Sequence, residues 1–267
     1  MASAKLATGA APRWGSAFLA WVVAWVRVVW LGAVLGVLAL SPSSWRAPTR
    51  SALARHAYTD TAPILAGFTL LSALLTLVIT RIVVVTAQSY GLSQYALEMV
   101  IRVLVLELIP LGAALVVALR CTIPNGAALA GLRRRGRFTA LAGAGQDPLV
   151  VEVLPRMVAG IFSTVTLAAL SSVVGMVLAY LAVYGFTEAG LAAYSRMFGR
   201  VFDGTVSLIF ILKTFFFSLA VSIIPLASSL LDLRPGTSRE AAALQGLVRM
   251  FAVLLVLEAV SLVGNYY

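Results

Sequence analysis

The chain has 267 residues, of which 61% are apolar and only 11% are charged, and its mean hydropathy is +1.00. Such a composition leaves too few polar side chains to cover a soluble domain of this length, so a water-soluble globular fold is excluded. The formal net charge is +10, but the arginines lie between apolar runs, where basic residues mark cytoplasmic loops. The charge therefore indicates membrane topology, and no nucleic-acid partner is expected.

The apolar residues form runs of about 20, whereas a membrane barrel would show alternating segments of about 10. This pattern predicts an all-α polytopic membrane protein with a single domain over residues 1–267. The chain has one cysteine, Cys121, and one histidine, His56. Neither a disulfide framework nor a Cys/His metal cluster can form from these residues alone, and no metal site is expected.

The first apolar run, residues 14–40, contains four tryptophans. Tryptophan prefers the headgroup level, and the run is longer and less aliphatic than the core of a signal peptide. We therefore expect an interfacial or re-entrant elbow helix here, with a spanning helix as the alternative.

Five later runs are predicted to span the membrane. They cover residues 62–87, 95–119, 151–184, 205–231 and 244–264. Residues 88–94 contain no lysine or arginine, whereas residues 120–137 contain five arginines. The positive-inside rule then places the amino terminus inside and the carboxyl terminus outside. Arg196 and Arg200 oppose this assignment, because they fall in a predicted outside link.

Charged residues inside spans are costly unless they face a partner or a wet cavity. At about 1.5 Å per residue, Glu107, Lys213 and Glu258 are expected at a similar depth in three different spans. Arg102 follows Glu98 by four residues, the spacing at which opposite charges share a helix face. Two interpretations stay open: a polar layer that lines a cavity for a lipid headgroup, or buried ion pairs, Glu98 with Arg102 and Glu107 with Lys213, that fix helix packing.

Residues 124–147 form a segment that is small, basic and predicted to be cytoplasmic. Two interpretations apply to it: a solvated loop that touches anionic headgroups, or a surface on which a soluble partner docks. The chain contains no phosphate-binding Gly-x-x-x-x-Gly-Lys-Ser/Thr motif, no Gly-x-Ser-x-Gly elbow and no His-Glu-x-x-His pair. No enzymatic activity and no catalytic residue are expected.

More specific motifs appear from the second predicted span onward. Glu107-Leu108-Ile109-Pro110 resembles the Glu-Leu-Gly-Pro of MlaE-type (YrbE-like) permeases, the membrane subunits of lipid-moving ABC transporters. As in that family, Arg120, Asp147-Pro148 and Pro155-Arg156 then follow in matching order and spacing. Lys213 and Glu258 also fall where the family commonly has a lysine and an acid.

The chain departs from the family pattern at several motif positions. Leu106 replaces a usual arginine, Ile109 replaces the glycine, and Cys121-Thr122 replaces a Val/Ala-Gly pair. Gly136-Arg137-Phe138 stands in place of a Thr-Glu-Gln-like triplet. These differences indicate a divergent member whose contact with an ATPase differs from the usual one.

The resemblance implies a homodimeric permease in the bacterial inner membrane, which moves phospholipid or a related lipid to or from a periplasmic MCE-domain protein. It also implies a cytoplasmic coupling helix between the second and third spans. ATP and Mg²⁺ would be bound by a separate cytoplasmic ABC ATPase, and this chain would hold no cofactor. The expected lipid-pathway residues are Glu107, Arg102, Lys213 and Glu258. The expected ATPase-coupling residues are Arg133, Arg134, Arg135, Arg137, Asp147 and Pro148. The structural motif residues are Pro110, Arg120, Pro155 and Arg156.

Two other classes of function remain as alternatives. One is a secondary transporter driven by protons through Glu107 and Glu258. The other is a structural membrane subunit without transport.

Overall fold

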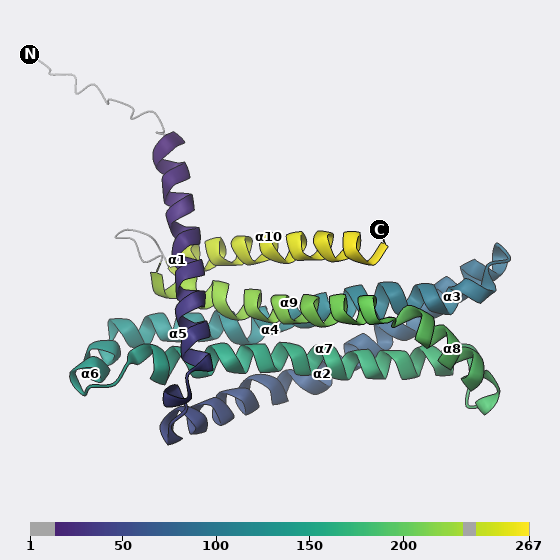
Figure 1. Cartoon of the computed structure of the whole chain (residues 1–267), viewed down its shortest axis with the longest axis horizontal. Coiled ribbons are helices and arrows are strands. Elements are labelled where there is room, and N and C mark those ends of the chain that lie inside the picture. The colour runs from purple at the N-terminus through teal and green to yellow at the C-terminus, as the bar shows by residue number, and fades with distance from the viewer. Residues whose placement is uncertain (1–13, 232–238, 267) are drawn as a thin grey trace, which may run out of the picture.

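The computed structural model describes residues 14–231 and 239–266 (Figure 1). All regular structure in these ranges is helical, and six helices are long and apolar enough to cross a membrane. The predicted all-α polytopic fold is therefore confirmed. The sixth candidate membrane span is the first helix, which the sequence analysis predicts to lie in the membrane interface.

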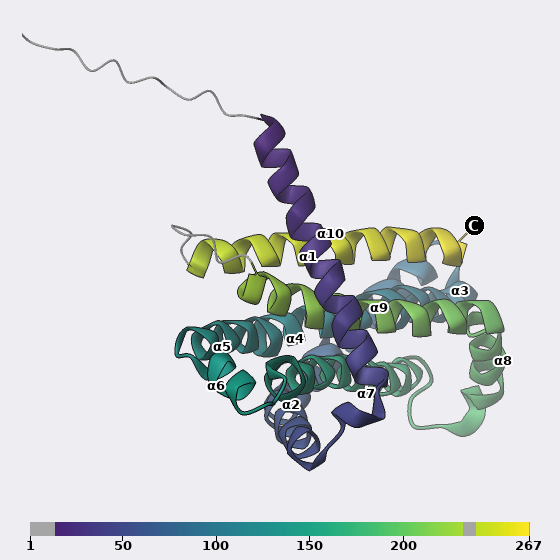
Figure 2. The same ribbon diagram turned by 60° about the vertical axis from the view of Figure 1, so that its left-hand side comes forward.

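This first helix, α1 (Trp14–Leu40), runs across the bundle formed by the later long helices instead of along it (Figures 1 and 2). A short 3-10 turn, η1 (Pro42–Ser44), follows it, and Trp45 Nε1 donates to the Ala39 carbonyl at 2.8 Å. A transverse helix of this kind has the geometry that an elbow helix in the interface requires. The interfacial role stays a prediction.

Helix α2 (Ala47–Ser89) begins well before the predicted start at residue 62. It has 43 residues and is therefore about 64 Å long, compared with about 30 Å for the hydrocarbon core of a bilayer. The first turns of α2 contain the basic residues Arg50 and Arg55. These turns are at the end of the bundle where α5 and α6 lie (Figure 1).

The second predicted span also continues past its expected end at residue 119. Helical turns run without a break through α3 (Ser93–Val100), η2 (Ile101–Leu108), α4 (Ile109–Val117), η3 (Ala118–Thr122) and α5 (Ile123–Arg134). η2 and η3 are π-helical, and each lies just before a proline, Pro110 or Pro124, that has no N–H to donate. The wider turns let the helix continue through both prolines.

Most of residues 124–147 are helical, as the expected coupling helix between the second and third spans requires. After α5 the chain turns at Gly136, whose φ of +75° is favourable only for glycine, and forms α6 (Arg137–Gly143). A second turn at Gly145 leads into η4 (Leu149–Val153), which is also π-helical.

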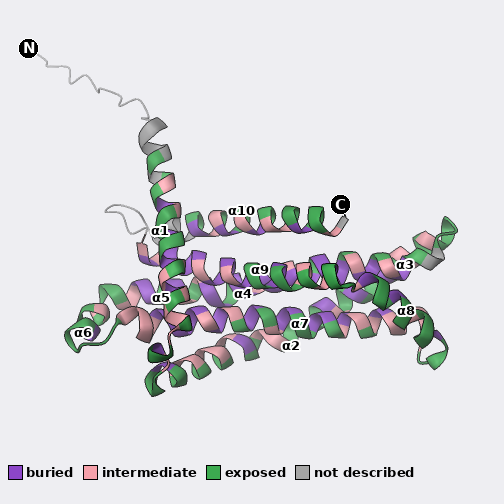
Figure 3. Cartoon of the chain, viewed as in Figure 1, coloured by how far each residue is buried: buried purple, intermediate pink, exposed green. Residues whose placement is uncertain are grey.

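The remaining helices complete the bundle. They are α7 (Leu154–Tyr184), the short η5 (Glu188–Gly190), α8 (Leu191–Val201), α9 (Gly204–Leu231) and α10 (Arg239–Tyr266). Buried residues follow the faces of α4, α7 and α9 that meet, whereas α2 and α10 expose much of their surface (Figure 3). The exposed residues of α2 and α10 include large apolar ones such as Leu74 and Leu255. This pattern fits a bundle surrounded by lipid or by another helical chain.

Helices α2 and α7 pack through small and hydroxyl-bearing residues. Thr61 and Ser163 share a hydrogen bond of 2.8 Å, and Thr69 and Ser171 share one of 3.5 Å. Small residues let membrane helices approach closely, and hydroxyl pairs hold them in register. This packing places the start of α7 beside the first turns of α2.

Candidate functional site

A cluster of charged residues lies inside the bundle where η2, α9 and α10 meet. Lys213 of α9 forms ion pairs with Glu107 of η2 and with Glu258 of α10, the latter at 2.8 Å between Nζ and Oε2. The exposed fractions of the three side chains are 1% for Lys213, 8% for Glu107 and 15% for Glu258. One ammonium group therefore pairs with two carboxyl groups and ties three elements together.

Pro110 contributes an acceptor to this cluster. Proline has no N–H, so the Leu106 carbonyl four residues earlier lacks its usual helical donor. Lys213 Nζ donates to that carbonyl at 3.2 Å. The ammonium group thus donates hydrogen bonds to Glu107 and to the Leu106 carbonyl, and it forms an ion pair with Glu258.

Asn265 is a member of the cluster that sequence reasoning missed. Its Nδ2 donates to Glu107 Oε1 at 3.1 Å. The sequence spacing could have identified it, because Asn265 follows Glu258 by seven residues and so lies on the same face of α10. Glu107 thus accepts from two different helices.

Arg102 is not brought to this cluster. Its Nε pairs with Glu98 Oε1 at 3.2 Å, within the same helical stretch, and both side chains are about one quarter exposed. Leu106, which replaces a basic family residue, is buried. Arg102 therefore does not supply in the Lys213 cluster the positive charge that is missing at residue 106.

The Lys213 cluster is closed within a single chain, since all three ionised side chains are largely buried and paired. This geometry agrees with the interpretation in which buried ion pairs fix the packing of the helices. A lipid headgroup can reach Lys213 only if the helices that carry Glu107 or Glu258 move away.

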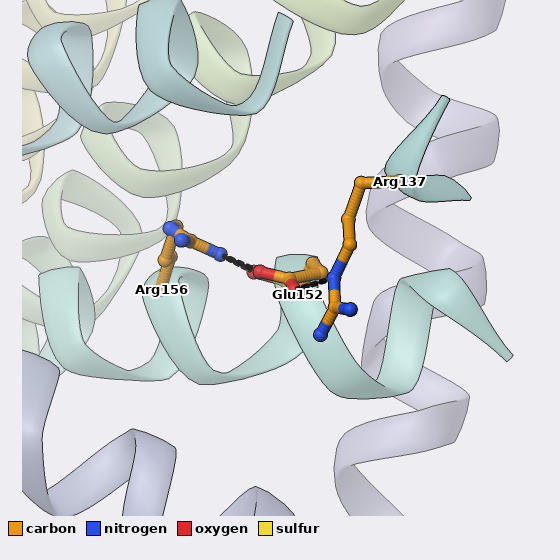
Figure 4. Close-up of polar contacts among 3 residues, drawn as sticks. All are labelled: Arg137, Glu152 and Arg156. Atoms are coloured by element: carbon orange, nitrogen blue, oxygen red, sulfur yellow. Dashed lines mark hydrogen bonds and ion pairs between the residues drawn. The ribbon is translucent and has the colours of Figure 1, made fainter. Parts of the chain in front are cut away.

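A second cluster joins residues 124–147 to η4 and the start of α7 (Figure 4). Glu152 of η4 accepts from Arg137 of α6 at 3.3 Å and from Arg156 of α7 at 2.8 Å. Arg156 also donates to the Glu152 backbone carbonyl. Arg137 is about half exposed, whereas Glu152 and Arg156 are largely buried, so the Glu152–Arg156 pair is the stronger part.

Glu152 was not singled out from the sequence, although it precedes Arg156 by four residues, a spacing that allows a pair on one helix face. Pro155 and Arg156, the predicted motif, are both buried at this joint. Asp147, one of the predicted coupling residues, accepts from the Leu149 N–H at 2.9 Å and so holds the turn before η4. Pro148 is the residue that leads into this π-helical turn.

Helix α5 is anchored to two spans. Arg133 Nη1 donates to the Leu230 carbonyl in the last turn of α9, where helical carbonyls lack internal donors. Asn125 Nδ2 donates to Asp60 Oδ2 of α2 at 2.7 Å. A Cβ atom on Gly126 would lie 3.0 Å from the Pro225 carbonyl of α9, so only glycine allows this approach.

The other basic residues of the segment point outward. Arg134 and Arg135 are exposed, and so is Arg120 of the preceding η3. From α1, Arg27 donates to the Leu231 carbonyl at 3.2 Å, beside the bond from Arg133. Across the described ranges no group of three or more His, Cys, Asp or Glu residues is placed to hold a metal ion.

A comparison with known protein families matches residues 53–263 to the family described as Permease MlaE. A comparison with curated proteins finds no match. The family match includes both charged clusters and all the long helices from α2 to α10. Because it covers most of the chain, this multi-pass membrane protein belongs to the MlaE permease family and is a transporter subunit rather than an enzyme.

Proposed function

We propose that the chain is the permease of an ABC transporter that moves phospholipid or a related lipid between the bacterial inner membrane and a periplasmic MCE-domain protein. Two copies would form the permease, and a cytoplasmic ABC ATPase would bind ATP and Mg²⁺. The observation that carries this proposal is the anchoring of residues 124–147, which are bonded to α2, to α9 and to Glu152 of η4, which in turn pairs with Arg156 of α7. A docking segment must be fixed to the spans in this way if force on it is to move them.

In this mechanism, closure of the ATPase presses on α5 and α6. The exposed Arg134 and Arg135 offer charges to the partner, while Arg133 and Arg137 face the spans. Movement of α9 relative to η2 and α10 separates Lys213 from Glu107 or Glu258. The released ammonium group then attracts the phosphate of a lipid headgroup, and re-formation of the ion pairs expels it.

The test is the transfer of a fluorescent phospholipid from proteoliposomes that contain the full chain, the ATPase and the carrier protein. Glu107→Ala should abolish ATP-dependent transfer and leave dimer assembly intact, as measured by crosslinking. Glu98→Ala is the matched control, because it removes an acid from the same helical stretch outside the Lys213 cluster. Normal transfer by Glu107→Ala would rule out its role.

The same assay separates the alternatives. Transfer that requires a proton gradient and continues without the ATPase would establish a secondary transporter. Assembly with partners, without bound lipid and without transfer, would establish a structural subunit.

A further inference from the structure

Helix α8 forms a basic surface that the permease mechanism does not use. It lies between the end of α7 at Tyr184 and the start of α9 at Gly204, at the end of the bundle opposite α5 and α6 (Figure 1). Figure 2 shows it turned across the direction of α9. Because α7 and α9 are both candidate spans, their connection lies at the membrane surface.

One face of α8 is fixed against the bundle. Met197 and Val201 are buried in a cluster that includes Leu97 of α3. Tyr194 donates from its hydroxyl to the Met176 carbonyl of α7 at 3.0 Å. The rotation of α8 about its own axis is therefore determined, and so is the face that it presents outward.

The outward face carries Arg196 and Arg200, one helical turn apart and both exposed. Neither forms an ion pair or a side-chain hydrogen bond to another described residue, and α8 itself has no acid. The nearby Asp203 accepts from the Val206 N–H at 2.7 Å and holds the first turn of α9. Two unpaired arginines on one surface are thus available to an anion.

The edge of α8 opposite the two arginines is apolar and aromatic. Leu191 is exposed, and the partly exposed Phe198 stacks on Phe202 with ring centroids 4.5 Å apart. An apolar edge opposite a basic face is typical of an amphipathic helix that lies in the headgroup layer, where aromatic rings are also enriched. Neither a solvated helix nor a helix docked only on protein requires this exposed apolar edge.

We propose that α8 lies in the headgroup layer and that Arg196 and Arg200 bind the phosphates of anionic phospholipids there. This explains two arginines in a link that the positive-inside rule assigns to the outer side. Their place is on a surface helix, not in a loop that determines topology. The inference does not depend on transport or on the ATPase.

The test uses the full chain, reconstituted in phosphatidylcholine nanodiscs, with a fluorophore on Ala193→Cys in a Cys121→Ala background. Nitroxide-labelled phosphatidylserine should quench the fluorophore more strongly than nitroxide-labelled phosphatidylcholine. In Arg196→Gln/Arg200→Gln the apparent affinity for the anionic lipid should fall about 25-fold, since each arginine near an anionic surface contributes about 1 kcal/mol.

Two controls make the result specific. Arg134→Gln/Arg135→Gln removes the same charge at the other end of the bundle and should leave the quenching unchanged. Arg196→Lys/Arg200→Lys keeps the charge and should retain most of the preference. Equal quenching by the two lipids, or an unchanged preference in the glutamine variant, would overturn the proposal. Displacement of the lipid by inorganic phosphate beyond the effect of matched chloride would also overturn it, because the site would then bind a free anion.

Discussion

Replacement of Lys213 by methionine tests whether the cluster of Lys213, Glu107 and Glu258 is desolvated. Methionine keeps the unbranched stem, so the main change is the loss of the charge. The two carboxylates, only 8% and 15% exposed, then face each other without a cation. Removing one partner of a buried ion pair costs about 3–5 kcal/mol, because an uncompensated charge is left behind. Glu258→Gln leaves a neutral Lys213–Glu107 pair, so it should lower the free energy of unfolding far less than Lys213→Met.

The assay is thermal unfolding of the purified full chain in detergent, followed by tryptophan fluorescence. At about 2–4 °C per kcal/mol for a chain of this size, Lys213→Met should lower the Tm by about 6–20 °C. The triple variant with Glu107→Gln and Glu258→Gln removes all three charges and should recover most of the loss. A Tm within about 2 °C of the unmodified chain for Lys213→Met would refute the reasoning, because the carboxylates would then be solvated.

Two further stability predictions concern packing and the cytoplasmic joint. A Cβ atom on Gly160 would lie 2.6 Å from Ser222 Oγ, so Gly160→Ala should lower the free energy of unfolding by about 1–3 kcal/mol. A Cβ atom on Gly67 would have nothing within 4 Å, so Gly67→Ala should not destabilise the chain. Equal melting temperatures for these two variants would contradict the close approach of α7 and α9. Glu152→Gln should cost about 3 kcal/mol because it leaves a buried arginine unpaired, whereas Arg137→Gln, at a half-exposed position, should cost less than about 1 kcal/mol. Chemical unfolding measures the free energy of unfolding of both variants. A larger loss of stability for Arg137→Gln than for Glu152→Gln would show that the Glu152–Arg156 pair is not the stronger one.

The fold class was predictable because a bilayer leaves few choices to an apolar chain. Backbone groups in hydrocarbon must bond within their own segment, so runs of about 20 apolar residues have to be helices. Helix ends were not predictable by this rule, because α2 and α5 continue outside the hydrocarbon. There the helices are held by tertiary contacts such as the Asn125–Asp60 bond, which hydropathy cannot report.

The members of the Lys213 cluster were predictable for a related reason. The rise of a helix is fixed, so counting from the span ends placed Glu107, Lys213 and Glu258 at one depth, and the structure brings them together. Depth alone does not select partners, however. Arg102 was expected to line the lipid pathway with this group, but it pairs with Glu98, one turn away on its own helix, as the ion-pair interpretation predicted.

Helix α9 connects the Lys213 cluster with the end of the bundle where α5 lies. It carries Lys213 in its first half, and its last carbonyls accept from Arg133 and Arg27. Lys213 and Leu230 are 17 positions apart, about 26 Å along one helix, and Pro225 between them removes one backbone hydrogen bond. A displacement of α5 would reach the Lys213 ion pairs through this single helix. In the proposed transporter, variants at Glu152 should then reduce lipid moved per ATP hydrolysed, because they loosen the segment that receives the force. Variants at Glu107 should instead stop transfer while the ATPase contact stays intact, so parallel measurement of ATP hydrolysis and lipid transfer distinguishes the two ends.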